Sequence, residues 1–225
     1  KEEPKWHGEI AGALISTHGN TNSLSESFSA ALHRRSAIDR TLLSYDYYYQ
    51  EQEDKDTGET ETTQDKWKAR GRYDYFFSKK LYGFADTRYE RDAVAELERR
   101  VLIGAGVGYQ WVESEPFNFS TDAGIAARHE SYYNNTESSS QLTAQLGYHL
   151  DKKLTKTLTF INDLTYYPAI EKISDYYLTT TAELRAQLTE IIFANFKVVF
   201  DYDATPAAGQ HNTDVKYILG IGVKF

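Results

Sequence analysis

Cysteine and methionine are absent from this 225-residue chain, and proline occurs only four times. Without cysteine there can be no disulfide framework, thiolate zinc site or cysteine nucleophile. No stretch approaches the roughly 18 consecutive apolar residues of a membrane helix. The formal net charge of −8 argues against broad nucleic-acid binding. Because no methionine precedes Lys1, we expect a processed, exported chain whose signal peptide is not part of this sequence.

Apolar side chains alternate with polar or small ones over long stretches of the sequence. Between positions 65 and 75 the odd residues are Trp67, Ala69, Gly71, Tyr73 and Tyr75, and the even ones are Lys66, Lys68, Arg70, Arg72 and Asp74. A helix would spread these charges around its circumference, whereas a strand places them on one face. The pattern therefore predicts β-strands that are apolar on one face only.

Twelve segments pass this test. They cover residues 6–17, 23–34, 40–52, 64–76, 81–92, 99–112, 117–131, 139–150, 157–167, 177–187, 193–202 and 213–225. An even number of strands, each about 11 residues long, is typical of outer-membrane barrels. We expect a single domain over residues 1–225, an all-β transmembrane antiparallel up-and-down β-barrel of twelve strands in a bacterial outer membrane.

The connections between these segments alternate in length, as they do in outer-membrane barrels, where periplasmic turns are short and outer loops are longer. With Phe225 on the periplasmic side, the short turns are 35–39, 77–80, 113–116, 151–156 and 188–192. The outer connections are 53–63, 93–98, 132–138, 168–176 and 203–212, and the tight turn at His18–Thr21 is an exception. This alternation favours a membrane barrel over a soluble β-sandwich.

Aromatic residues on the apolar parity gather near both expected ends of the strands, where Trp and Tyr settle at membrane interfaces. The periplasmic group is Tyr73, Tyr75, Tyr109, Trp111, Phe117, Phe119, Tyr148 and Phe225, and the outer group is Tyr45, Tyr47, Tyr49, Tyr89 and Tyr166. The wall positions between them are Leu24, Phe28, Leu32, Val101, Ile103, Val107, Ile125, Leu142, Leu146, Leu184, Phe196 and Val198.

The last segment ends on an aromatic residue. Its apolar face consists of Tyr217, Leu219, Ile221, Val223 and Phe225. Many outer-membrane barrels end in this way, and the ending resembles the signal read by the barrel-assembly machinery. We therefore expect that machinery to be a partner during biogenesis, with outer-membrane lipid and lipopolysaccharide as the surroundings of the finished barrel.

Three groups of residues resemble one family. They are Trp6-His7-Gly8-Glu9 with Thr17-His18-Gly19-Asn20-Thr21, then Arg72–Phe76 with Tyr89–Asp92, and finally Gly104–Tyr109. These motifs look like the YdiY-like group of Gram-negative outer-membrane proteins of unknown function, often labelled salt-induced or acid-induced. The resemblance implies an outer-membrane location and a role in envelope stress. It brings no catalytic residues and no cofactor. The glycines of the third motif also have a structural interpretation, because inward-facing Gly104, Gly106 and Gly108 free space in the lumen.

Charged residues of both signs fall on the inward parity. They are Lys66, Lys68, Arg70, Arg72, Asp86, Arg88, Glu90, Arg100, Asp122, Arg128, Glu130, Glu183, Arg185, Lys197 and Asp201. Twelve strands lie between small filled barrels and wide porins, so two readings stay open. In one, ion pairs cross and plug a closed structural barrel. In the other, the same residues line a narrow channel for small ions or solutes.

The turn at 77–80 permits two registers for the cation ladder formed by Lys66, Lys68, Arg70 and Arg72. In the first register Arg70 faces Asp86 and Lys66 faces Glu90; in the second Arg72 faces Asp86 and Lys68 faces Glu90. Either register brings Arg88 opposite another cation. The two remaining ladder cations must meet acids across the lumen, or stay hydrated and give a conducting barrel an anion preference.

An enzymatic reading rests on His129 and Ser131, which share the outward face near an outer loop. Outer-membrane phospholipases carry a serine-histidine pair in such a place, but a His-x-Ser sequence in a strand is common by chance. No catalytic or metal-binding motif occurs in the chain. We expect no enzyme activity and no cofactor.

The stretch 51–65 is acidic, with Glu51, Glu53, Asp54, Asp56, Glu59, Glu61 and Asp65 against Lys55 alone. This composition predicts a solvated outer loop. Carboxylates are also ligands for divalent cations, so bridging to lipopolysaccharide is an alternative, although the spacing specifies no set of metal ligands.

Overall fold

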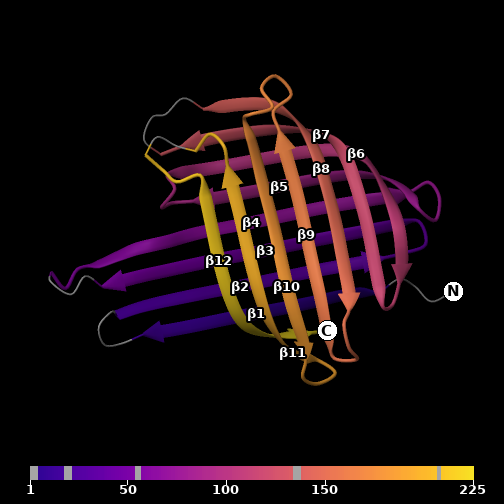
Figure 1. The fold of residues 1–225 in the computed structure, drawn as a ribbon, viewed down its shortest axis with the longest axis horizontal. Coiled ribbons are helices and arrows are strands. Elements are labelled where there is room, and N and C mark those ends of the chain that lie inside the picture. Colours follow the sequence, from indigo (N-terminus) through magenta and orange to yellow (C-terminus); the bar gives the residue numbers. More distant parts are fainter. Residues whose placement is uncertain (1–4, 18–21, 54–56, 134–137, 207–208) are drawn as a thin grey trace.

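Twelve antiparallel strands close into one barrel in the computed structural model, which describes residues 5–17, 22–53, 57–133, 138–206 and 209–225. The strands are β1 (Trp6–Thr17), β2 (Asn22–Arg35), β3 (Asp39–Glu53), β4 (Thr60–Phe76), β5 (Leu81–Asp92), β6 (Leu97–Ser114), β7 (Phe117–Tyr132), β8 (Ser139–Lys153), β9 (Leu158–Pro168), β10 (Tyr176–Gln187), β11 (Ile192–Asp203) and β12 (Thr213–Lys224). Each strand pairs with its neighbours in sequence, and β1 pairs with β12 (Figure 1). The predicted up-and-down barrel is confirmed.

The strands extend past several predicted ends. β4 begins at Thr60 rather than 64, and β6 spans Leu97–Ser114 rather than 99–112. Backbone pairing continues there, beyond the apolar stretch that the sequence pattern detects, because antiparallel ladders need no apolar face. On one side of the barrel the β1–β2 and β3–β4 hairpins project beyond the other strands (Figure 1). The described residues contain no helix that is long and apolar enough to cross a membrane.

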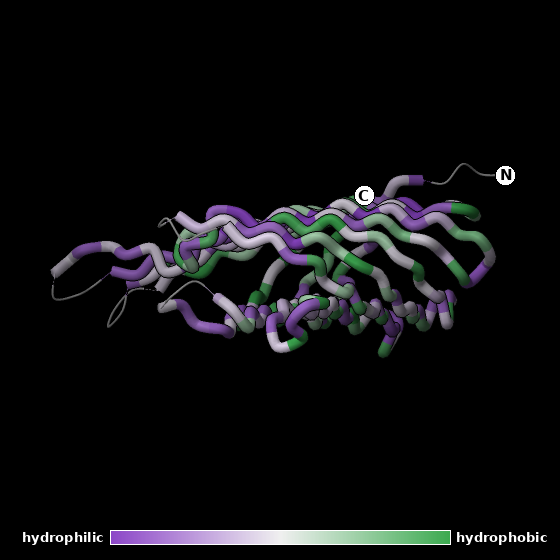
Figure 2. Tube along the Cα trace, turned by 90° about the horizontal axis from the view of Figure 1, so that it is seen from above, coloured by the Kyte–Doolittle hydropathy of each residue, from purple (hydrophilic) through white to green (hydrophobic). Residues whose placement is uncertain are grey.

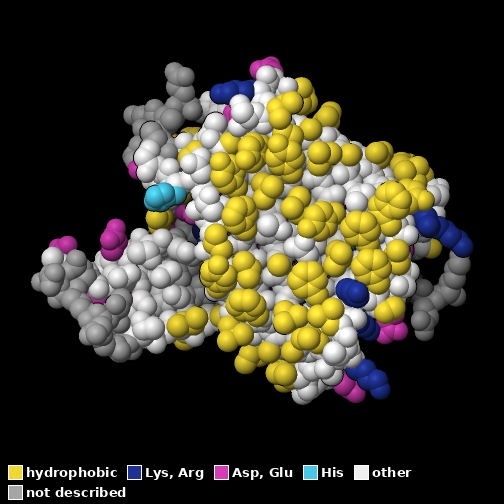
Figure 3. Space-filling view, in the orientation of Figure 1, with side chains coloured by type: hydrophobic (Ala, Val, Ile, Leu, Met, Phe, Trp, Pro, Cys, Tyr) yellow, Lys and Arg dark blue, Asp and Glu magenta, His cyan; other side chains and the backbone are white. Residues whose placement is uncertain are grey.

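The outward face of the barrel is apolar. Ile103, Val107, Ile125, Leu142 and Phe196 are all exposed, and they lie on five predicted wall positions. Figure 2 shows hydrophobic and hydrophilic residues alternating along the strand traces, and Figure 3 shows hydrophobic side chains spread over the barrel wall. So much exposed apolar surface is far more than a soluble monomer carries.

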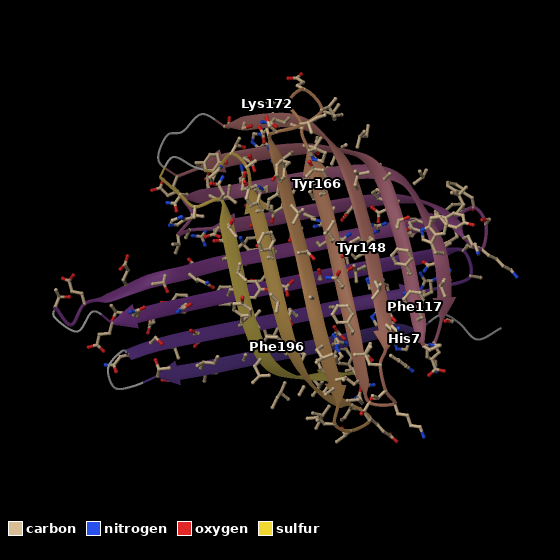
Figure 4. All side chains as sticks on the ribbon, viewed as in Figure 1. His7, Phe117, Tyr148, Tyr166, Lys172 and Phe196 are labelled. Atoms are coloured by element: carbon tan, nitrogen blue, oxygen red, sulfur yellow. The ribbon has the colours of Figure 1, made fainter. Side chains whose placement is uncertain are left out.

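Aromatic rings form contacts between neighbouring strands on this outward face. Tyr45, Trp67 and Tyr89 make a row across β3, β4 and β5, with Trp67 and Tyr89 stacked at a centroid distance of 4.8 Å. Near the opposite rim, Phe119 contacts both Phe117 and Tyr148. The labelled side chains of Phe117, Tyr148, Tyr166 and Phe196 lie on four different strands of the wall (Figure 4). Both aromatic groups therefore lie on the face predicted for them.

The inward glycines of β6 receive bulky neighbours. A Cβ atom at Gly108 would overlap the ring of Tyr82, one at Gly106 would overlap the backbone of β7 and the ring of Phe84, and one at Gly104 would overlap the side chain of Gln145. Tyr82 and Phe84 are buried, and so is Gln145. The glycines do free space, as predicted, but large side chains fill it.

The barrel closes through a short pairing of its first and last strands. Glu9–Gly12 of β1 pair with Lys224–Ile221 of β12, and Gly8 and Phe225 exchange backbone hydrogen bonds of 2.8 and 2.9 Å. The ring of Phe225 lies over Gly8 and is otherwise exposed. All five residues of the predicted assembly signal, from Tyr217 to Phe225, have exposed side chains.

Ile103 tests whether the apolar wall faces lipid. Its side chain is 62% exposed on β6, so Ile103→Arg would place a charge in hydrocarbon and cost about 2–4 kcal/mol of folding free energy. Ile173, which is 72% exposed in the outer connection before β10, provides the same substitution outside the strands. We expect a cost near zero for Ile173→Arg in a bilayer unfolding titration. Equal costs at both positions would contradict a lipid-facing wall.

Phe225 tests the assembly signal. In Phe225→Ala the backbone bonds to Gly8 can still form, but the terminal aromatic ring is lost. We expect barrel assembly by the bacterial machinery to slow several-fold, and Phe225→Tyr to restore the rate. The measurement follows the appearance of the folded, heat-modifiable electrophoretic form over time. If Phe225→Ala assembles at the native rate, the terminal aromatic residue is not the signal.

Candidate functional site: a charge network across the lumen

The predicted lumen residues all lie inside the barrel, buried or half-buried. They come from β4 to β7, β10 and β11, and they are Lys66, Lys68, Arg70, Arg72, Asp86, Arg88, Glu90, Arg100, Asp122, Arg128, Glu130, Glu183, Arg185, Lys197 and Asp201. Strand alternation explains this placement, because the residues flanking each of them on its strand point outward. The inward face therefore concentrates charge within a wall that is apolar outside.

The β4–β5 pairing follows the second of the two predicted registers. Arg72 is opposite Asp86, Lys68 is opposite Glu90, and Arg70 is opposite Arg88. The side chains nevertheless lean along the strand, so that each contacts the acid that lies opposite the next inward residue of β4. Arg70 contacts Asp86 at 2.8 Å and Lys66 contacts Glu90 at 2.8 Å, which are the pairs of the other register. This lean lets Arg70 bind a carboxylate although its cross-strand neighbour is a cation.

Arg88 avoids the predicted repulsion by turning toward other groups. Its guanidinium donates to Thr165 Oγ1 at 2.8 Å, lies 3.6 Å from Asp86, and stands 5.4 Å from the ring centre of Tyr167. These contacts connect β5 to β9. Asp86 thus serves two cations, and it also accepts a hydrogen bond of 3.3 Å from Gln145.

The two other ladder cations find acids across the lumen. Lys68 on β4 contacts Asp201 on β11 at 2.7 Å, and Arg72 contacts Asp122 on β7 at 3.1 Å. Lys66 also reaches Asp201, at 3.3 Å. All four ladder cations are therefore paired, and the positive strip that would have given an anion preference does not form.

Arg100 is the centre of a second cluster toward the outer end. It contacts Glu130, Asp203 and, at 3.5 Å, Glu90, and its guanidinium lies 4.2 Å from the ring centre of Tyr177. The Tyr177 hydroxyl donates to Glu90 at 3.1 Å and is 3.2 Å from Asp201. Glu90 and Asp201 join this cluster to the ladder, so one network spans β4, β5, β6, β7, β10 and β11.

Two further arginines form ion pairs inside the barrel. Arg128 contacts Asp175 at 2.7 Å, and Arg185 contacts both Glu183 and Glu9 at 2.7 Å. Asp175 lies in the connection before β10. Burial opposes ionisation of its carboxyl, but hydrogen bonds from Gln141 and Arg128 and the arginine charge outweigh burial and lower the pKa. This loop carboxylate is therefore an anion that caps the outer end of the network.

Several partners in the network were not predicted. Glu9 and Asp46 could have been found, since they fall on the inward parity of β1 and β3, where Asp46 contacts Lys197 at 3.8 Å. Asp175 lies in a loop and Asp203 at the end of β11, where alternation gives no signal. At the opposite rim, His149 Nδ1 lies 2.8 Å from Asp163, and both residues fall on the inward parity of their strands.

Small cavities lie among the described residues of the barrel. One, of about 50 Å³, lies at the outer end and is lined by residues that include Lys66, Arg100, Tyr177 and His211. Another, of about 10 Å³, is lined by β1, β2, β3, β11 and β12 and includes Lys197 and Asn195. One water molecule needs about 10–15 Å³, so these spaces suit a few waters rather than a sugar.

His129 lies on the outward face between two serines. Its Nδ1 is 2.8 Å from Ser140 Oγ, and its Nε2 is 3.5 Å from Ser131 Oγ. The second distance exceeds the reach of about 2.6–3.2 Å for a base and its nucleophile. Ser131 also accepts a hydrogen bond of 3.1 Å from Arg99. The described contacts supply no carboxylate to orient the imidazole ring.

The acidic stretch 51–65 is only partly described, because residues 54–56, and with them Asp54, Lys55 and Asp56, lie outside the described residues. Glu51 accepts a hydrogen bond of 2.9 Å from Tyr49, and Glu53 accepts one of 2.7 Å from Asn22. No group of three or more His, Asp or Glu side chains suited to a metal ion occurs among the described residues.

Comparisons with known proteins agree with this architecture. A family model described as "Protein of unknown function, DUF481" matches residues 11–225, so the chain belongs to this family. No curated protein matches the sequence. The solved NanC porin is similar with a TM-score of 0.54 at 8% identity over 97% of this chain and 96% of that one. The KdgM porin gives a TM-score of 0.48 at 11% identity over 98% and 99%. At such identities the likeness to the NanC porin shows the barrel fold alone.

Arg100 and its neighbour Arg99 provide a matched test of the network. Arg100→Gln would leave the buried Glu90 and Glu130 and the half-buried Asp203 without their shared cation. Breaking such a buried network by removing one partner costs about 3–5 kcal/mol. Arg99 faces outward and is exposed, so Arg99→Gln should cost less than about 1 kcal/mol. Urea unfolding in a bilayer measures both, and equal effects would contradict a network centred on Arg100.

Proposed function

We propose that this member of the DUF481 family is a bacterial outer-membrane barrel whose lumen is closed at mid-depth by the charge network. The observation that carries the proposal is the pairing of all four ladder cations, two of them with acids on distant strands. The filling of the space beside the β6 glycines by Tyr82 and Phe84 supports it. A closed structural or interaction barrel is the function that this geometry favours.

The membrane location follows from the wall. An apolar outer surface around a charged interior is the inverse of a soluble protein, and a closed barrel leaves no strand edge to face hydrocarbon where its pairing is complete. We propose export through a signal peptide, assembly by the barrel-assembly machinery, and surroundings of outer-membrane lipid and lipopolysaccharide. Catalysis has no part in the proposal, because Ser131 lies 3.5 Å from His129 and the described contacts give His129, which lies 2.8 Å from Ser140, no carboxylate to orient its ring.

A narrow ion channel is the second candidate. The water-sized cavities beside Lys66 and Lys197 favour it, because separation of a few ion pairs could join them. If such a path opened through loss of the ladder cations, Asp86, Glu90, Asp122 and Asp201 would lose these partners. The channel would then prefer cations, the reverse of the preference expected from an unpaired ladder.

Single-channel recording in a planar bilayer separates the two candidates. We expect no steady conductance from the native barrel. Replacing Lys66, Lys68, Arg70 and Arg72 together by Ser should produce conductance with a cation preference. Lys68→Ser alone is a milder variant that removes one cross-lumen pair and should give brief openings. Steady conductance from the native protein would contradict the closed lumen, and an anion preference in the serine variants would contradict the pairing.

The finer assignment to the YdiY-like group and to envelope stress is also a proposal. Its support is the resemblance of the motifs at Trp6–Glu9, Arg72–Phe76 and Gly104–Tyr109. We expect the transcript of this protein to rise in its own bacterium after a shift to high salt or to low pH. Unchanged transcript levels after both shifts would contradict the stress role and leave the barrel unaffected.

A further inference from the structure

The closing seam of the barrel is complete over only part of its length. Pairing between β1 and β12 stops at Gly12 and Ile221, although β1 continues to Thr17 and β12 starts at Thr213. Within the described residues, Ala13–Ile15 pair with β2 alone, and Val215–Gly220 pair with β11 alone. Figure 1 shows the two strands diverging from the paired end. The outer half of the seam is thus open at the level of the backbone.

An open strand edge cannot face hydrocarbon. Each unsatisfied backbone N–H or C=O group in a bilayer core costs several kcal/mol, so a molecule with hydrogen-bonding groups must meet the part of this edge that lies at membrane depth. The outward side chains beside the seam are apolar, with Leu14 69% and Leu219 68% exposed. An occupant of the seam therefore needs a polar part for the edges and an apolar part for the wall.

Behind the seam lies a buried cation that forms no ion pair. Lys216 is 8% exposed. Every other buried lysine or arginine of the described residues forms an ion pair. Lys216 has no ion pair and no hydrogen bond among the described contacts, and its ammonium instead lies 5.6 Å from the ring centre of Tyr48. Tyr48 also lines the smaller cavity, together with Lys197 and with Asp46, which pairs with Lys197 at 3.8 Å. Lys216 is therefore the cation beside this cavity that forms no ion pair.

The same cavity contains an unsatisfied acceptor. Asn195 is 4% exposed, and its Oδ1 atom is buried without a hydrogen-bond partner, while its Nδ2 donates to Glu183 at 3.3 Å. Asn195 lies opposite Gly220 on β12, and a Cβ atom at Gly220 would come within 2.8 Å of Oδ1. The missing side chain therefore leaves the acceptor accessible from the seam. An unsatisfied buried acceptor of this kind requires a donor.

We propose that the outer half of the β1–β12 seam binds an anionic membrane lipid, whose phosphate lies near Lys216 and whose hydroxyl donates to Asn195 Oδ1. Its acyl chains lie against Leu14 and Leu219 outside. The cavity has room for about one water molecule, so the strands separate further as the head group enters, which the missing backbone bonds permit.

A strand from a second protein is the competing occupant, because open edges invite strand addition. The charge favours the lipid. A strand would satisfy the edge but leave Lys216 without an ion pair. A phosphoglycerol head group instead brings acceptor oxygens and hydroxyl donors to the edge and an anion to Lys216, and charge-assisted hydrogen bonds are the stronger kind. The lipid proposal rests on the proposed membrane location, and the experiment tests the two separately.

The chain contains no cysteine, so a single introduced thiol reports on one place. Leu219→Cys, labelled with a small fluorophore, reports on the seam, and Ile103→Cys reports on the far wall. Each is reconstituted with brominated phosphatidylglycerol or brominated phosphatidylcholine, which quench on contact. At Leu219 we expect phosphatidylglycerol to associate about tenfold more strongly than phosphatidylcholine, from one charge-assisted hydrogen bond. At Ile103 we expect the two lipids to be equal.

Lys216→Gln should abolish the preference at Leu219, and the exposed Lys152→Gln should preserve it. The proposal is overturned if the preference is absent at Leu219, survives Lys216→Gln, or occurs equally at Ile103. It is also overturned if soluble glycerol phosphate at millimolar concentration removes the preference, or if the protein is a dimer cross-linked through Leu219→Cys. Failure of both lipids to quench at Ile103 would instead contradict the membrane location.

Discussion

A charge inside this barrel has little water around it and an apolar wall behind it, so every buried cation of the described residues except Lys216 meets an opposite charge. This constraint explains most of the interior. Taking an ion out of water costs several kcal/mol, and the cost is recovered only where geometry and additional hydrogen bonds are good. Arg100 recovers this cost through contacts with three carboxylates. Asp201 recovers it through two lysines and the hydroxyls of Thr179 and Tyr177. A barrel with so many charged residues inside it therefore needs the network in order to fold.

The same constraint connects the fold to the proposed function. A porin keeps its lumen charges hydrated by leaving a wide channel, whereas here Lys68 and Arg72 reach acids on β11 and β7. Tyr82 and Phe84 fill the space left by the β6 glycines. We propose that a lumen with so many shared contacts excludes large solutes.

Much of the fold could be predicted from the sequence, because period-two alternation identifies both the strands and their faces. The ladder, the wall and the aromatic rows all lie on the predicted faces. The register between β4 and β5 could not be decided from the sequence, since Asp86 and Glu90 face cations in both alternatives. In the structure the backbone follows one register, and the side chains of Arg70 and Lys66 form the ion pairs of the other. Contacts across the lumen depend on which strands lie opposite each other in the closed barrel. Lys68 and Asp201 are 133 positions apart, and alternation within a strand carries no information on such a pair.

If the charge network closes the lumen, residues on opposite strands must be energetically coupled. A double-mutant cycle with Lys68→Ser and Asp201→Ser, measured by unfolding in a bilayer, tests this coupling. Contacting residues of one network show a coupling energy of about 0.5–3 kcal/mol, and we expect a value in the upper half of that range for this buried pair. A coupling energy of zero would mean that the two side chains are separately hydrated in an open lumen, and it would contradict the closed barrel.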